Sequence, residues 1–163
     1  MVECFELSPE RLYDMVYKTI TTFSGGNEMN DTTVEYLEQV RQDFESSPFW
    51  KFAGLQTQKL EAGHVELYLP YRQHYDNVRG TIHGGMYMSV LDTTMGMLCR
   101  SMGANDVMTI QMTTQFLKPV IQEAVYSKAA VINRTRSTAL VEGTLFNEKD
   151  ELVAHCTATF KLK

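Results

Sequence analysis

The first third of the chain repeats its apolar residues every three or four positions, which is typical of amphipathic helices. Gly25-Gly26 ends the first repeat, a capping-box pattern at Asp31 or Thr32 starts the second, and Ser47-Pro48 starts the third. The pattern predicts three helices, over residues 9–23, 31–46 and 48–53. The last helix is rich in aromatic residues, so it should pack against a hydrophobic surface.

After Gly54 the period of the pattern changes to two, which is typical of strands. Strands are predicted over residues 55–60, 64–69, 108–116, 124–133, 138–147 and 152–162. The third strand should place one alternating set on an apolar face: Met108, Ile110, Met112, Thr114 and Phe116. The last strand should do the same with Leu152, Ala154, Cys156, Ala158, Phe160 and Leu162. Each of these strands therefore has one face that must be covered.

One long apolar stretch, Gly80–Ser101, separates the second strand from the third. Asp92 is its only charged residue between Arg79 and Arg100. A helix that is apolar all round belongs inside a protein. It is a poor membrane span, because a carboxylate near the middle of a bilayer costs about 3 kcal/mol. We therefore expect an α+β protein in which a strongly curved antiparallel sheet wraps around this central helix.

Length, charge and cysteine usage narrow the class of protein further. A chain of 163 residues is expected to form one domain. The net charge of −5 argues against nucleic acid as a partner, because phosphate contacts need clustered lysine and arginine. The three cysteines and four histidines stand at no metal-ligand spacing, so we expect no metal. The acidic N-terminus lacks the features of a signal peptide, which predicts a cytoplasmic protein with no membrane partner.

Two features of the central helix predict chemistry. Gly84-Gly85 opens the helix without side chains, so backbone N–H groups at its positive end can receive an anion or a developing oxyanion. Asp92 lies eight residues after Gly84, and an unpaired buried carboxylate is costly to keep. Its chemistry would be that of a general base towards water or of a nucleophile. The structural alternative is a carboxylate hydrogen-bonded at a subunit contact.

The segments Asn77–Asp92 and Thr109–Pro119, with His83-Gly84-Gly85 ahead of the acidic helix, carry a family resemblance. They resemble the hotdog-fold acyl-CoA thioesterases of the phenylacetic-acid-degradation type. The resemblance covers residues 54–163 as a hotdog thioesterase domain. Residues 1–53 are then a helical extension, which we expect to pack on that core.

The resemblance implies a site in two halves and an activity. The residues implied are Asn77, His83 and Gly84 in one half, and Asp92 and Thr109 in the other. Thr109 stands where relatives have serine. The implied reaction is hydrolysis of an acyl-CoA to a carboxylic acid and free CoA, with coenzyme A as part of the substrate and no other cofactor. Contacts to CoA are expected at Gly85, Arg134 and Arg136. The rival functions are a non-catalytic acyl-CoA-binding module and a hotdog dehydratase.

The spacing of the two halves predicts a homodimer. Eight residues of α-helix separate Gly84 from Asp92 by about 12 Å along the axis. That is too far for Asp92 to act on a carbonyl held by the Gly84 N–H, because reacting atoms must approach to about 3–3.5 Å. Two antiparallel helices related by a twofold axis would bring Gly84 of one chain opposite Asp92 of the other. We therefore expect shared sites in a homodimer, and leave open a homotetramer built as a dimer of dimers.

Overall fold

The computed structural model describes residues 31–163, of which Glu35–Lys163 form one compact unit. Two helices come first, α2 over Asp31–Glu45 and α3 over Pro48–Ala53, and both were predicted. The predicted helix over residues 9–23 lies outside the described residues. Its packing on the core therefore stays a prediction.

A capped turn fixes the direction in which α3 follows α2. The Ser47 hydroxyl accepts a hydrogen bond from the Trp50 N–H at 3.2 Å, and Pro48 occupies the first turn. Gly54 ends the helix in the left-handed region at φ 59°. Trp50 is consequently carried into the core, where it is 5% exposed, whereas Phe49 stays 40% exposed. The predicted packing of this aromatic helix against a hydrophobic surface is confirmed for Trp50.

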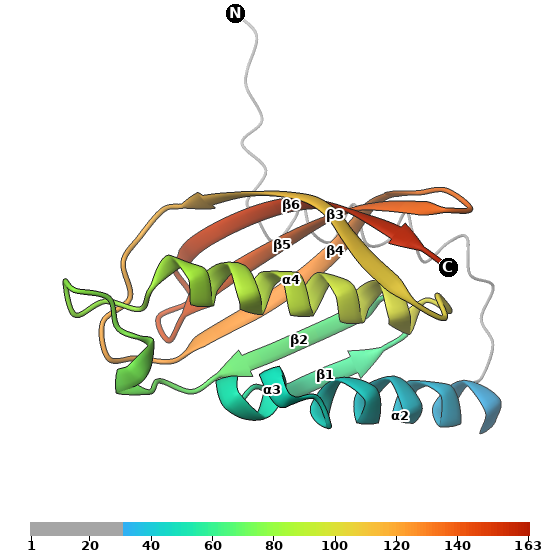
Figure 1. Cartoon of the computed structure of the whole chain (residues 1–163), viewed down its shortest axis with the longest axis horizontal. Helices are drawn as coiled ribbons and strands as arrows, with labels where there is room; N and C mark the ends of the chain where they lie inside the picture. Colours follow the sequence, from blue (N-terminus) through green and yellow to red (C-terminus); the bar gives the residue numbers. More distant parts are fainter. Residues whose placement is uncertain (1–30) are drawn as a thin grey trace, which may run out of the picture. The chain divides into compact units, whose positions relative to one another are not determined.

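Six strands form one antiparallel sheet that curves around the longest helix (Figure 1). The strands are β1 Gln56–Glu61, β2 His64–Leu69, β3 Val107–Phe116, β4 Val125–Arg134, β5 Thr138–Asn147 and β6 Leu152–Leu162. Their order across the sheet is β1-β2-β4-β5-β6-β3, so β1 and β3 are its two edges. A short 3-10 helix, η1 over Gln73–Tyr75, follows β2. The predicted antiparallel sheet around a central helix is confirmed.

The central helix, α4, spans Gly84–Ser101 and contacts strands β2 to β6 (Figure 1). At Gly143 of β5 the sheet approaches α4 so closely that an added Cβ would lie 3.1 Å from Leu91 and 3.2 Å from Met95. The buried hydroxyls of Thr94 on α4 and Ser127 on β4 hydrogen-bond to each other across the same interface. Among the helices of residues 31–163, none has the length and apolarity needed to cross a membrane.

The prediction that α4 is buried on every side is wrong for one stripe of its surface. Gly85, Met88, Ser89 and Asp92 are exposed or half-buried. Residues three, four and seven positions apart share one face of a helix, so these four form a continuous open stripe. The turn that follows, residues 94–99, is buried throughout. The sheet therefore covers the second half of α4 more completely than the first.

The edge strand β3 differs from its predicted alternation. Its pairing with β6 shifts register between Thr109 and Gln111, which marks a β-bulge at Ile110. The extra residue inverts the phase of the strand, so that Met112 faces the core while Met108 and Ile110 are 55% and 57% exposed. The single predicted apolar face is therefore wrong at Met108 and Ile110.

The last strand, β6, shows a similar departure at its first residue. Its pairing with β5 shifts register so that Phe146 lies opposite Leu152 and Leu145 opposite Ala154. Val153 is fully buried, whereas Leu152 is 36% exposed. The predicted inward face is confirmed from Ala154 onward and wrong at Leu152.

Candidate active site

The carboxylate of Asp92 lies at the end of the open stripe of α4 and is half-buried. The Thr109 hydroxyl on β3 donates a hydrogen bond to Asp92 Oδ1 at 2.7 Å. Within residues 35–163, Asp92 Oδ2 has no hydrogen-bond partner. A carboxylate with one oxygen held and the other free can accept a proton from water or attack a carbonyl. The structure thus brings together the two residues predicted for this half of the site.

His83 caps the start of α4 and leaves one backbone donor unused. The ring nitrogen Nδ1 of His83 accepts the Gly85 backbone N–H at 2.9 Å, and the backbone N–H of His83 donates to the Tyr75 carbonyl at 2.8 Å. The Gly84 N–H has no acceptor within the described part of the chain. An added Cβ at Gly84 would lie 3.0 Å from the Phe116 ring, so a side chain there would have to displace this exposed ring. What remains is an uncovered N–H at the positive end of a long helix, suited to a carbonyl oxygen or an anion.

Asn77 holds the loop that leads to His83. Its side-chain oxygen accepts the Arg79 N–H at 2.8 Å, and its side-chain nitrogen donates to the Thr81 hydroxyl at 2.8 Å. Its backbone N–H donates to the Thr81 carbonyl at 2.8 Å. Within one chain Asn77 is therefore a turn residue. A direct part in a shared site stays a prediction.

The two predicted halves remain apart within one chain. Gly84 begins α4, and Asp92 follows eight residues later on the same unbroken helix, about 12 Å along its axis. His83 and Asn77 lie at the Gly84 end, and Thr109 lies at the Asp92 end. A single copy of the chain therefore holds two half-sites.

A cavity of about 380 Å³ opens beside Asp92 between α4, β3 and the α2–α3 segment. Its walls are aromatic: Phe44, Phe49, Trp50 and Phe160. Thr93, Gly96 and Arg100 continue the α4 wall away from Asp92. The volume lies within the range of roughly 300–1,000 Å³ that is usual for ligand pockets. We call it the Asp92 cavity.

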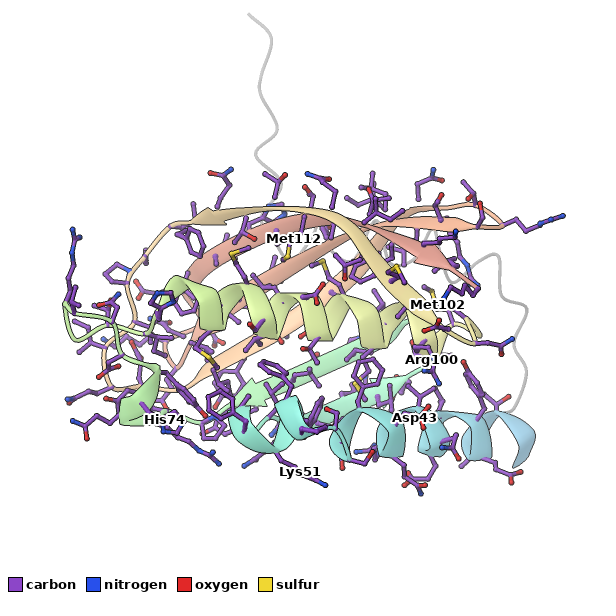
Figure 2. The ribbon with its side chains drawn as sticks, viewed as in Figure 1. Asp43, Lys51, His74, Arg100, Met102 and Met112 are labelled. Carbon is purple, nitrogen blue, oxygen red and sulfur yellow. The ribbon has the colours of Figure 1, made fainter. Side chains whose placement is uncertain are left out.

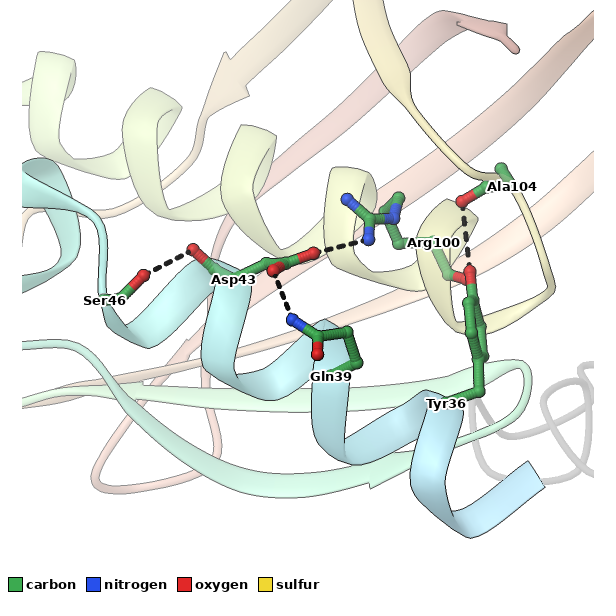
Figure 3. Close-up of polar contacts among 6 residues, drawn as sticks. All are labelled: Tyr36, Gln39, Asp43, Ser46, Arg100 and Ala104. Atoms are coloured by element: carbon green, nitrogen blue, oxygen red, sulfur yellow. Dashed lines mark hydrogen bonds and ion pairs between the residues drawn. The ribbon is translucent and has the colours of Figure 1, made fainter. Parts of the chain in front are cut away.

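Polar contacts join α2 to the C-terminal end of α4 (Figure 3), where Asp43 and Arg100 both line the Asp92 cavity. Arg100 Nη2 donates to Asp43 Oδ2 at 2.7 Å, and the two side chains face each other in Figure 2. Gln39 holds the other Asp43 oxygen at 2.8 Å. The Tyr36 hydroxyl lies 2.8 Å and 3.1 Å from the carbonyls of Arg100 and Ala104, and the Arg100 carbonyl also accepts the Gly103 N–H at 3.0 Å.

Arg100 is the functional candidate that the sequence did not single out. Its Nε–H is buried and has no acceptor among the described residues, and such a group costs about 1–3 kcal/mol. Asp43 keeps its negative charge to low pH, because the hydrogen bond from Arg100 lowers the pKa of this carboxyl. A usable signal was present in the sequence: Arg100 comes eight residues after Asp92, and such residues lie close to one face of a helix.

The basic residues predicted to contact CoA lie at the opposite end of α4 from Gly84. Arg134, at the end of β4, donates to the Met102 carbonyl at 2.9 Å, just beyond the end of α4. Arg136 is exposed in the turn between β4 and β5. Both are open to solvent, and their contact with CoA stays a prediction. Gly85, the third residue predicted for CoA, is exposed in the first turn of α4.

The described thiols are poorly suited to act as nucleophiles. Burial raises the pKa of Cys99 to about 11, and burial is also the main cause of the raised pKa of Cys156. A thiol must lose its proton to attack a carbonyl, so both stay inert near neutral pH. No cluster of three or more metal-ligating side chains occurs within residues 31–163. Asp92 is the side chain in the cavity with a free nucleophilic or basic oxygen.

A match to a family model agrees with this geometry. Residues 79–154 match the thioesterase superfamily, a span that includes Gly84, Asp92 and Thr109. The match covers just under half of the 163-residue chain. His83, Gly84, Asp92 and Thr109 lie inside the matched span, whereas Asn77 and the α2–α3 wall of the Asp92 cavity lie before it. The prediction of a thioester hydrolase is confirmed at the level of the superfamily.

Solved structures share the fold of this chain. A thioesterase family protein from Silicibacter pomeroyi is 27% identical, with a TM-score of 0.72 over 77% of this chain and 96% of that one. The E. coli PaaI protein, from the phenylacetic acid degradation operon, is 19% identical, with a TM-score of 0.72 over 78% and 96%. A hypothetical thioesterase from Streptococcus pneumoniae, solved with coenzyme A, is 23% identical, with a TM-score of 0.69 over 75% and 95%. The predicted hotdog fold is confirmed.

Proposed function

We propose that this thioesterase hydrolyses acyl-CoA thioesters to a carboxylic acid and free CoA. The observation that carries the proposal is the Asp92 carboxylate, with one oxygen held by Thr109 and the other free, in the lining of a cavity of about 380 Å³. Such a cavity suits the acyl group and leaves the larger CoA moiety outside. Coenzyme A in the Streptococcus pneumoniae structure of the same fold supports CoA as the thiol.

The residues divide the reaction between them. The Gly84 N–H donates to the thioester carbonyl oxygen and stabilises the negative charge that develops there. Asp92 either takes a proton from the attacking water or attacks the carbonyl carbon itself. The carbon–sulfur bond then breaks, and the CoA sulfur leaves and takes up a proton; where Asp92 is the nucleophile, water then hydrolyses the acyl–Asp92 anhydride to the carboxylic acid and restores the Asp92 carboxylate. Thr109 keeps the carboxylate in position, while His83 and Asn77 shape the turn that exposes the Gly84 N–H.

A homodimer completes the site in this proposal, because Gly84 and Asp92 of one chain lie about 12 Å apart along α4. Two surfaces support pairing of two copies. The open stripe of α4 lacks a cover in one chain, and the neighbouring edge strand β3 exposes Met108 and Ile110. An apolar edge strand is a liability unless another element pairs with it. Twofold pairing at β3 would cover both surfaces and place the two helices antiparallel.

The direct test replaces the proposed catalytic carboxylate at nearly constant volume. Asp92→Asn should reduce kcat on the best acyl-CoA of a broad panel by about 10²- to 10⁴-fold, the usual contribution of a general base. Release of free thiol, followed with a chromogenic reagent, measures the rate. Asp106→Asn is the matched control, because Asp106 also lines the cavity but pairs with Lys163 at 2.8 Å. Near-normal turnover by Asp92→Asn would overturn the assignment, and wild-type binding without turnover would favour the binding-module alternative.

The shared site has its own test. Gly84→Pro removes the proposed N–H donor at a helix position that accepts proline, and Asp92→Asn removes the carboxylate. Each variant alone should be inactive. Mixed dimers hold one intact pairing of Gly84 with Asp92, so subunit exchange should restore part of the activity. No recovery in verified mixed dimers, or an active wild-type monomer, would refute the shared site.

A further inference from the structure

The Asp92 cavity changes its chemistry along its length. Phe44, Phe49, Trp50 and Phe160 line it with aromatic rings, whereas its end at Arg100, eight residues after Asp92 on α4, is polar because Arg100 pairs there with Asp43. Because helical side chains lean toward the helix N-terminus, the Arg100 side chain extends back toward Asp92. A group that enters with its carbonyl at Asp92 therefore passes aromatic rings before it meets a guanidinium.

The guanidinium of Arg100 has donors to spare. Arg100 has five N–H donors, and one of them bonds to Asp43 at 2.7 Å. Its Nε–H has no acceptor within residues 35–163 but is buried, and Tyr36 also contacts the side chain, so the remaining Nη donors are the ones that a group in the cavity would reach. An acyl group that ends in a methyl would leave this end of the cavity unsatisfied. An acyl group that ends in an oxygen acceptor would complete it.

The charges around the cavity favour a neutral oxygen over a carboxylate. Asp43 neutralises Arg100, and Lys163 neutralises Asp106 at 2.8 Å. Asp92 is then the one charge lining the cavity that has no opposite partner in the described part of the chain. A second carboxylate at the far end would meet this negative field without a free cation to bind it.

We propose that the Asp92 cavity selects acyl groups that carry a neutral oxygen, such as a hydroxyl or ketone, at the end remote from the thioester, and that Arg100 is the specificity-determining residue that binds this oxygen. The inference rests on the proposed function, since it takes Asp92 as the position of the thioester carbonyl. The size agrees with it: a cavity of about 150 Å³ holds benzene, so 380 Å³ accommodates a ring or a chain with its terminal group. A site built to bond a substrate oxygen discriminates strongly against analogues that lack it.

The test compares acyl-CoAs that differ only at the far end: octanoyl with 8-hydroxyoctanoyl, and phenylpropionyl with 4-hydroxyphenylpropionyl. Wild type should prefer the oxygenated member of at least one pair by about tenfold or more in kcat/KM. Arg100→Met keeps the apolar stem and should reduce this ratio to about threefold or less. Arg41→Met is the matched control, because Arg41 also lies beside α2 carboxylates but does not line the cavity. An unchanged ratio in Arg100→Met, or a wild type that prefers the apolar member, would overturn the inference.

A second variant keeps the test decisive should Arg100→Met fail to fold. Asp43→Asn keeps the Arg100 donors and removes the charge that neutralises them. It should keep the preference for 8-hydroxyoctanoyl-CoA and gain activity on the dicarboxylic octanedioyl-CoA, which wild type should reject. A variant that still rejects octanedioyl-CoA and loses the preference for the hydroxyl would contradict the role of Arg100.

Trp50 separates failure of the inference from failure of the proposed function. It is the only tryptophan in the chain and lines the cavity, so its fluorescence reports occupancy without any turnover. A change in Trp50 emission with an Arg100-dependent preference, but no hydrolysis, would uphold the inference and refute the thioesterase. Hydrolysis with the same ratio in wild type and Arg100→Met would uphold the thioesterase and refute the inference.

Discussion

Thr109→Val isolates the hydrogen bond that holds Asp92. Valine has nearly the shape of threonine, so the change removes the 2.7 Å bond to Asp92 Oδ1 and little else. A hydrogen bond to a charged group contributes about 1.5–3 kcal/mol. If the bond acts fully in the transition state, its loss corresponds to about 10- to 150-fold in rate, at 1.36 kcal/mol per factor of ten.

The stability cost of Thr109→Val should be smaller than its cost in rate. Asp92 is half-buried, so water can replace the lost donor in the resting enzyme. We expect a loss near 1 kcal/mol, which lowers Tm by about 2–4 °C in a chain of this size. Kinetics of thiol release and a thermal melt on the same preparation measure both quantities.

Two matched variants make the comparison sharp. Thr109→Ser keeps the hydroxyl and should stay within about threefold of wild type, since only one methyl is lost. Thr113→Val removes a hydroxyl from an exposed position of the same strand, where it accepts a bond from Gln111 at 2.7 Å, and should leave the rate unchanged. If Thr109→Val turns over as fast as Thr113→Val, Thr109 does not position the carboxylate.

Two further predictions concern the helix start and the contact between α2 and α4. Gly84→Ala keeps the backbone N–H but places a methyl 3.0 Å from the Phe116 ring, which is 54% exposed and can move aside, so Tm should fall by only about 1–2 °C. Gly84→Pro removes the N–H, so its kcat/KM should fall at least tenfold below that of Gly84→Ala; equal activity of the two variants would argue against the Gly84 N–H as the carbonyl donor. The pKa of Asp43 is lower in the folded protein than the unfolded pKa of 3.8, so ionised Asp43 stabilises the fold above pH 3.8, and this stabilisation is lost as the pH falls through the folded pKa. The Tm difference between wild type and Asp43→Asn should therefore shrink below pH 3.8, and a difference independent of pH would contradict this contact.

Local patterns were enough to predict most of the fold. The starts and ends of α2, α3 and the six strands follow from apolar period, from the Ser47-Pro48 cap and from glycines at turns. The bulge at Ile110 escaped prediction, because it depends on how β3 pairs with β6 and not on the composition of β3. The alternation of apolar and polar residues describes one strand by itself, whereas register is set by the pairing of two strands.

The site was predictable in part for a related reason. Asp92 and the glycine turn are visible in one short stretch, because a lone carboxylate and a bare helix start contrast with their apolar surroundings. The far end of the cavity joins Asp43 to Arg100, which are 57 residues apart in the chain. Neither residue is unusual on its own helix, so only their contact reveals them.

The two edges of the sheet have opposite surface chemistry, and this limits how copies of the chain can associate. The β3 edge exposes Met108 and Ile110, whereas β1 carries Lys59 and Glu61 and is interrupted by a bulge after Thr57. Charged residues and bulges protect an edge from accepting another strand. A sheet in which only one edge strand is unprotected can pair with one other sheet through that edge, and no unprotected edge then remains for a further copy. If two copies pair through this apolar edge, as proposed, the association would end at a closed pair instead of a growing fibre.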